Sequence, residues 1–187
     1  MNRLVLLGTG CPAPSYRRFG PSTLIEINGE RYLFDTGSGV TQRLNELGLK
    51  SSDIDFVFIT HIHSDHIVDL YQLYISGWHQ GRNKPFKVIG PVGIKHFFTK
   101  QLESYYDELK LRKEYEMRPN EDGLNYEIIE IDDDFKFDKE NLSIKPFYVD
   151  HAPVNPAYGF KINFKKNKTE KSIIISGDTK KSENLIK

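Results

Sequence analysis

The sequence of 187 residues predicts a single α/β domain in which strands and helices alternate. The first observation is a series of short apolar runs bounded by Gly, Asn and Asp, a pattern typical of β-strands. The second is the run Phe56 to Thr60, whose continuous apolar character indicates a strand buried on both faces. The third is the helical spacing of apolar residues from Ile94 to about Arg118. Strands interleaved with helices favour a sandwich of sheets and helices.

The individual elements follow from local signals along the chain. We expect strands at 3–7, 22–27, 31–34, 56–60, 126–131, 142–149, 157–164 and 172–176, and helices at 40–47, 65–75 and 94–118, with a further helix opening in 180–187. The pair Asn28-Gly29 between two apolar runs is a strong signal for a hairpin turn. Residues 161–171 are expected to form two strands joined by a turn rich in Lys and Asn.

Composition excludes several classes of protein. Basic and acidic side chains number 26 each, so the formal net charge is zero, which excludes a uniformly basic protein that coats polyanions. The charge is uneven, however, because residues 161–187 hold eight basic and three acidic side chains. The single cysteine, Cys11, cannot form an internal disulfide, and no stretch approaches the length of a membrane span. We therefore expect a cytoplasmic protein without a membrane partner.

A cluster of histidines directly follows the buried strand. His61, His63 and His66 lie within six residues, with Asp65 among them. Two histidines at i and i+2 on an extended turn point the same way and can share one metal ion, whereas Asp65 and His66 are displaced enough to serve a second ion. Nitrogen and carboxylate ligands suit zinc, with manganese or iron as alternatives. A single-metal or regulatory histidine site is the competing interpretation.

The same four residues match the HxHxDH signature of the metallo-β-lactamase superfamily of binuclear metal hydrolases, which the chain resembles. Four further segments resemble other motifs of that superfamily and fall in the same order: Gly8-Thr9-Gly10, Phe34-Asp35-Thr36-Gly37, Asp150-His151 and Ser176-Gly177-Asp178-Thr179. The resemblance covers essentially the whole chain. It implies the αβ/βα four-layer sandwich of that superfamily.

The resemblance also implies a set of site residues. Metal one would be held by three histidines and metal two by three residues that include a shared carboxylate: His61, His63 and His151 for the first, Asp65, His66 and Asp178 for the second, with Asp178 bridging both. Asp35 would hold the second nitrogen of a ligand histidine, because such histidines need that nitrogen fixed by an acceptor. Asp65 is the expected catalytic residue, which would orient the nucleophile or accept its proton.

The resemblance further implies that residues 1–187 form one such domain with its second half incomplete. Members of this kind supply a last histidine to metal two from a later motif, and no histidine follows His151. Metal two would then be one ligand short. The alternative is a genuine short form in which water or a partner chain supplies the ligand.

The stretch Phe19-Gly20-Pro21-Ser22-Thr23 resembles the branch that contains ribonuclease Z and the metal-dependent arylsulfatases. His151 and Asp178 are only 27 positions apart, which leaves no room for the long arm that grips tRNA in the processing enzymes. The segment from His151 to Gly159 resembles the HxPVxPAxGY stretch of arylsulfatase-like members. We therefore expect a hydrolase in which metal-bound hydroxide attacks a small sulfate, phosphate or carboxylic ester.

Two alternatives to this expectation stay open. One is a tRNA 3′ endonuclease of the ribonuclease Z type, although the zero net charge disfavours a nucleic-acid partner. The other is an inactive fragment that binds metal. A homodimer is a further expectation, because related enzymes are often dimers.

Overall fold

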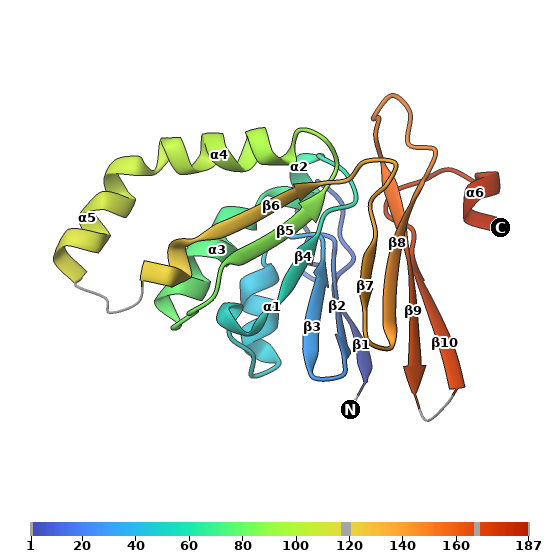
Figure 1. Cartoon of the computed structure of the whole chain (residues 1–187). Helices are drawn as coiled ribbons and strands as arrows, with labels where there is room; N and C mark the ends of the chain where they lie inside the picture. Colours follow the sequence, from blue (N-terminus) through green and yellow to red (C-terminus); the bar gives the residue numbers. More distant parts are fainter. Residues whose placement is uncertain (1, 117–120, 167–168, 187) are drawn as a thin grey trace.

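The computed structural model describes residues 2–116, 121–166 and 169–186, which form two sheets and several helices (Figure 1). The six-stranded sheet runs in the order β1 (Arg3–Gly8), β2 (Ser22–Ile27), β3 (Glu30–Phe34), β4 (Phe56–Phe58), β5 (Phe86–Gly90) and β6 (Tyr126–Glu130). The four-stranded sheet runs in the order β10 (Thr169–Ile175), β9 (Tyr158–Lys166), β8 (Leu142–Tyr148) and β7 (Phe137–Lys139). The helices are α1 (Val40–Glu46), α2 (Ser64–Ile67), α3 (Leu70–His79), α4 (Ile94–Ser104), α5 (Tyr106–Glu116) and α6 (Glu183–Ile186), with 3-10 turns at Ser51–Asp53 and Glu121–Leu124.

The six-stranded sheet is antiparallel at one end and parallel at the other. Strands β1, β2 and β3 pair antiparallel, and β3 to β6 pair parallel. The turn between β2 and β3 falls at the expected Asn28-Gly29, where both residues have positive φ angles of 53° and 85°. A two-residue hairpin turn of this kind requires that conformation. Because these strands are parallel, their carboxyl ends lie at one edge of the sheet, and helical connections join one strand to the next.

Two cores lie on opposite faces of this sheet. On one face, Leu33 and Val57 pack with Val40 and Leu44 of α1 and with the apolar side of α3 and α4. The other face packs against the four-stranded sheet, which stands beside it in Figure 1. The alternation of side chains along each strand explains this division, since successive residues point to opposite faces.

The core between the two sheets is aromatic. Phe58 lies at 5.1 Å from Phe34, 5.3 Å from Phe137 and 5.4 Å from Phe160 between ring centroids. Phe160 alternates along β9 with the exposed Lys161, so the inner face of the second sheet is apolar and the outer face is polar. The expected α/β sandwich is thereby confirmed. In the described ranges, the four-residue α6 is the element that borders the outer face of the second sheet.

The prediction of one helix over 65–75 is wrong, because the structure has α2 and α3 with a break at Asp69. Asp69 has φ −95° and ψ 13°, outside the helical region. Its carboxylate accepts the backbone N–H of Gly39 at 2.6 Å, and its own N–H donates to the carbonyl of Thr36 at 3.0 Å. These bonds to the loop between β3 and α1 take the place of those that would continue the helix.

The prediction of one continuous helix from Ile94 to about Arg118 is also wrong. The chain leaves the helical conformation at Tyr105 (φ −104°, ψ 16°), which separates α4 from α5. The ring of Tyr105 stacks on Tyr71 of α3 with 4.0 Å between centroids. The expected end of this helix at Arg118 and Pro119 lies outside the described residues, as does part of the turn expected in 161–171.

Candidate metal centre

The predicted ligands lie where the strands of both sheets end. His61 and His63 belong to the loop between β4 and α2, His151 follows β8, and Asp178 follows β10. The backbone holds these loops together, because Tyr158 N–H donates to the carbonyl of Thr60 at 3.0 Å across the two sheets. Loops that extend from rigid strand ends can present side chains with fixed geometry.

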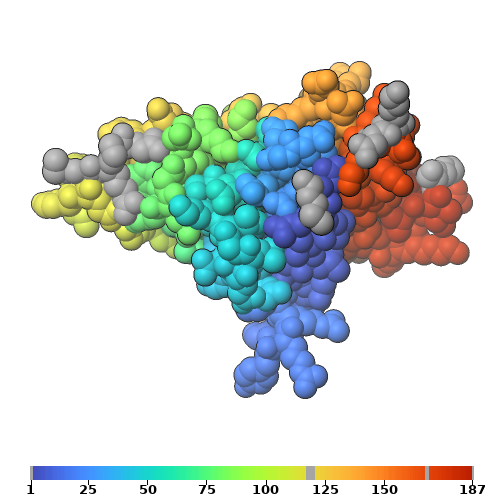
Figure 2. Space-filling model, turned by 90° about the horizontal axis from the view of Figure 1, so that it is seen from below, coloured from blue at the N-terminus to red at the C-terminus, as the bar shows by residue number. Residues whose placement is uncertain are grey.

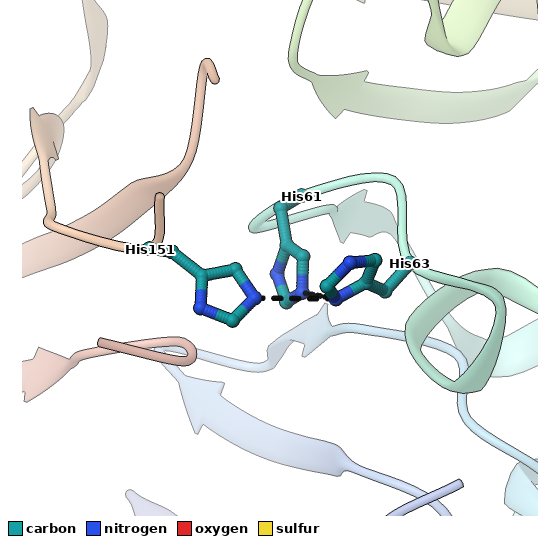
Figure 3. Close-up of side chains that lie close together, drawn as sticks. All are labelled: His61, His63 and His151. Carbon is teal, nitrogen blue, oxygen red and sulfur yellow. Dashed lines mark hydrogen bonds between the residues drawn. The ribbon is translucent and has the colours of Figure 1, made fainter. Parts of the chain in front are cut away.

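Three imidazoles form the first cluster (Figure 3). Nδ1 of His63 lies 3.0 Å from Nε2 of His61 and 3.2 Å from Nε2 of His151. Figure 3 shows His151 reaching this point from a segment opposite the loop that carries the other two. Tetrahedral zinc with bonds of about 2.0–2.1 Å to nitrogen separates its ligand atoms by about 3.3 Å. The spacing of the three nitrogens therefore fits one such ion.

His66 and the carboxylates form the second cluster. Nε2 of His66 lies 3.6 Å from Oδ1 of Asp178 and 3.8 Å from Oδ2 of Asp65. It is buried and has no hydrogen-bond partner among the described residues, although buried polar atoms are normally satisfied. Ligand atoms of His61, His66 and Asp178 all lie within 4.8 Å of one another. A buried nitrogen without a partner that faces two carboxylates fits a second divalent cation.

Asp35 fixes the orientation of the histidines. Its Oδ2 lies 2.8 Å from Nδ1 of His66, which leaves Nε2 of that ring facing the cluster. Its two oxygens also accept the backbone N–H of Thr60 at 2.8 Å and the Thr60 hydroxyl at 3.0 Å. Thr60 Oγ1 lies 2.9 Å from Nδ1 of His61, so Asp35 acts on both rings, directly on one and through Thr60 on the other. Asp35 has a φ of 61°, the left-handed region that non-glycine residues seldom adopt.

The charges of the site favour a bound cation. Burial, together with His66, His151 and His63, lowers the pKa of His61 to about 3, so this ring is neutral and can act as a ligand. Burial alone would lower the pKa of His66. The hydrogen bond that His66 donates to Asp35, together with the charges of Asp35, Asp178 and Asp65, outweighs burial, and the pKa of His66 is raised. The carboxylates around His66 favour a positive charge at this point, and imidazole with carboxylate groups is a donor set of divalent transition metals.

The structure thus places all six predicted ligands at one edge of the sandwich. The expected contact of Asp35 with a histidine predicted to be a ligand is the one with His66. Sequence reasoning missed Thr60, because its contact with Asp35 joins residues 25 positions apart and depends on the fold.

Comparison with known families identifies the chain. The family model described as "Anti-Pycsar protein Apyc1" matches residues 2–187. The chain belongs to this family. Among curated relatives, ribonuclease Z of Mycolicibacterium gilvum is 33% identical over 185 residues, which cover 96% of this chain and 62% of the relative. Ribonuclease Z of Mycobacterium marinum is 33% identical over 182 residues, which cover 96% of this chain and 63% of that relative. The chain therefore spans about 62% of the length of these relatives.

Two solved structures show the same fold as this chain. Human tRNase Z, short form, superposes with a TM-score of 0.74 at 27% identity, covering 95% of this chain and 69% of that one. The metallo-β-lactamase fold protein YhfI from Bacillus subtilis gives a TM-score of 0.71 at 16% identity, covering 98% and 64%, which shows the fold. The expected metallo-β-lactamase fold is confirmed, and the relatives are of the ribonuclease Z type. They lend no support to the arylsulfatase-like branch as the main interpretation.

No helix in the described ranges combines the length and the apolar character that a membrane crossing requires.

Proposed function

We propose that this chain carries the metal centre of a phosphodiester hydrolase that acts on RNA, as the names of its ribonuclease Z relatives suggest. The observation that carries the proposal is the pair of adjoining donor clusters described above. In this proposal His61, His63 and His151 hold one ion, Asp65 and His66 hold the other, and Asp178 lies between them. Zinc is the first candidate because imidazole and carboxylate ligands predominate.

Two divalent ions, when bound, would supply Lewis acidity at the phosphate and stabilise the charge that develops on its oxygens. The protein's own groups have separate tasks. Asp35 and Thr60 keep the ligand rings in one orientation. The side chain of Asp65 belongs to the second cluster and is 11% exposed, so its carboxylate can orient the attacking water and accept its proton.

A small sulfate or carboxylic ester is the competing substrate class. The strands β9 and β10 take up 16 of the 26 residues between His151 and Asp178, so this short segment leaves no room for a long arm of the kind that grips tRNA. The relatives' names weigh against a small ester, because they are ribonuclease Z and human tRNase Z. Substrate turnover separates the two classes.

The first experiment measures turnover of three substrates by the zinc-loaded protein: bis(p-nitrophenyl) phosphate, p-nitrophenyl sulfate and a precursor tRNA with a 3′ extension. We expect cleavage of the phosphodiesters, with a loss of at least about 100-fold in the His63→Ala variant, because one donor of the first cluster is removed. His96→Ala is the matched control, since His96 is exposed on α4 and belongs to neither cluster. Turnover of the sulfate without turnover of either phosphodiester would contradict the proposal.

Metal content tests the alternative of a metal-binding but inactive chain. We expect about two zinc equivalents per chain after loading and gel filtration, as measured by elemental analysis, because both clusters have converging donors. His63→Ala should retain about one equivalent, since the His66 cluster keeps its own donors. A wild-type value of one equivalent without phosphodiester turnover would favour the inactive chain.

A further inference from the structure

A cavity of about 360 Å³ adjoins the second cluster, and the function proposed above does not use it. Two groups of residues line it. One comes from the segment 11–20 and the other from the loops that carry the metal centre: Cys11, Pro12, Ala13, Pro14, Ser15, Arg18, Phe19 and Gly20, with Ser38, Ser64, Asp65 and Val68. Because Asp65 belongs to both the cavity and the metal site, a group bound in the cavity lies next to the reacting bond.

The segment from Cys11 to Phe19 forms the outer wall of this cavity. All nine of its residues are exposed, and Tyr16 is entirely so. Figure 2 shows blue side chains of this part of the chain standing away from the body. The base of the segment is firmly placed, because Gly20 and Gly37 pack backbone to backbone. A Cβ on Gly20 would lie 2.3 Å from the backbone nitrogen of Ser38, and one on Gly37 would lie 2.7 Å from the carbonyl of Asp65.

The lining combines an apolar wall with one cation. Pro12, Pro14, Phe19 and Val68 supply the apolar surface. Arg18 is the only basic residue of the lining, and within the described part of the chain it makes no ion pair. The segment 11–19 contains two arginines and no acidic residue. The guanidinium of Arg18 has no carboxylate partner among the described residues, so it can bind a phosphate. The apolar wall beside it suits a flat ring joined to that phosphate.

We propose that this cavity binds the nucleotide adjacent to the scissile phosphodiester, with the Arg18 guanidinium holding the phosphate of that nucleotide. This inference rests on the proposed function. The volume lies at the lower end of ligand sites, which fits one nucleotide rather than a folded RNA surface. The base would lie against the apolar wall without sequence-specific hydrogen bonds, as in single-strand binding sites.

Arg17 provides a matched control for Arg18. It is exposed, is adjacent in sequence and carries the same charge, but it does not line the cavity. A fluorescein-labelled RNA tetranucleotide with phosphorothioate linkages serves as the probe for binding to the zinc-loaded protein. We expect Arg18→Gln to weaken binding about tenfold, Arg17→Gln to weaken it less than twofold, and Arg18→Lys to restore part of the loss.

Salt dependence separates a phosphate contact from a structural role. The slope of log affinity against log salt should fall in magnitude by about 0.7 in Arg18→Gln, the value for one phosphate of a single strand, and should stay unchanged in Arg17→Gln. Cys11 gives an independent signal, because it is the single cysteine of the chain, is exposed and lines the cavity. The bound tetranucleotide should slow alkylation of Cys11 in the wild type and protect it less in Arg18→Gln.

The outcomes distinguish this inference from the proposed function. Equal affinities and equal salt slopes for Arg18→Gln and Arg17→Gln would overturn the inference, and so would a tetranucleotide that binds without protecting Cys11. If the wild type cleaves no phosphodiester, the proposed function fails, yet the binding and protection measurements still decide whether the cavity holds a nucleotide. Where cleavage occurs, the ratio of kcat/KM for the RNA to that for bis(p-nitrophenyl) phosphate should fall about tenfold in Arg18→Gln.

Discussion

Asp35→Ala is expected to lower the affinity for the second divalent ion by about 10–100-fold, the usual effect of removing the partner of a ligand histidine. The substitution frees Nδ1 of His66, so the ring can rotate or change its tautomer. It also leaves the backbone N–H of Thr60 buried without its acceptor, which costs about 1–3 kcal/mol of folding stability. Competition with a chromophoric chelator measures the affinity, and thermal unfolding measures the stability.

Asp69→Ala is the control for the Asp35 variant. Asp69 is half-buried and accepts a backbone N–H, from Gly39, but it contacts no imidazole among the described residues. We expect it to lose stability while keeping metal affinity within about threefold of the wild type, since the ligand rings keep their partners. Equal losses of metal affinity in the two variants would show that Asp35 acts only through general stability.

Phe58→Ala should destabilise the fold by about 3–5 kcal/mol, the range for deleting a buried aromatic side chain. Phe58 is fully buried and its ring packs on three other phenylalanines between the two sheets. For a domain of this size the melting temperature should fall by about 10 °C. Differential scanning calorimetry of the metal-free and metal-loaded proteins measures the change.

Tyr115→Ala supplies the matched control for this aromatic deletion. Tyr115 is 78% exposed on α5, a helix without buried residues. Its removal should change the free energy of unfolding by less than about 0.5 kcal/mol, as is usual for surface positions. A comparable loss in both variants would mean that the aromatic core between the sheets does not stabilise the fold.

The candidate site was predictable from the sequence because its central part is local. His61, His63, Asp65 and His66 follow one buried strand, so four donors could be recognised from six consecutive residues. Thr60 could not be recognised, because its role depends on the positive φ angle of Asp35 and on a hydrogen bond between two loops. The cavity beside Asp65 was also missed, since its wall is an exposed segment without periodicity.

The fold was predictable where hydrophobic patterns and turn signals agree, as in the hairpin at Asn28-Gly29. The breaks at Asp69 and Tyr105 were not predictable, because the apolar spacing continues through both positions. Each break depends on a contact with a distant residue, Gly39 in one case and Tyr71 in the other. The strands β5 and β7 were not predicted, and β7 contains a single apolar residue, Phe137, so it has no apolar pattern to recognise.

The three histidines of the first cluster come from two different sheets, and this bears on the stability of the fold. His61 and His63 extend from the six-stranded sheet and His151 from the four-stranded sheet, so an ion held by all three would join the two sheets at their rim. Such an ion would link the two sheets. It would raise the free energy of unfolding by about 2.7 kcal/mol when the free metal concentration is 100 times the dissociation constant. Removal of the ion by a chelator should then accelerate amide hydrogen exchange first in β8 to β10. Without the ion, this sheet would separate from the six-stranded sheet before the rest of the domain unfolds.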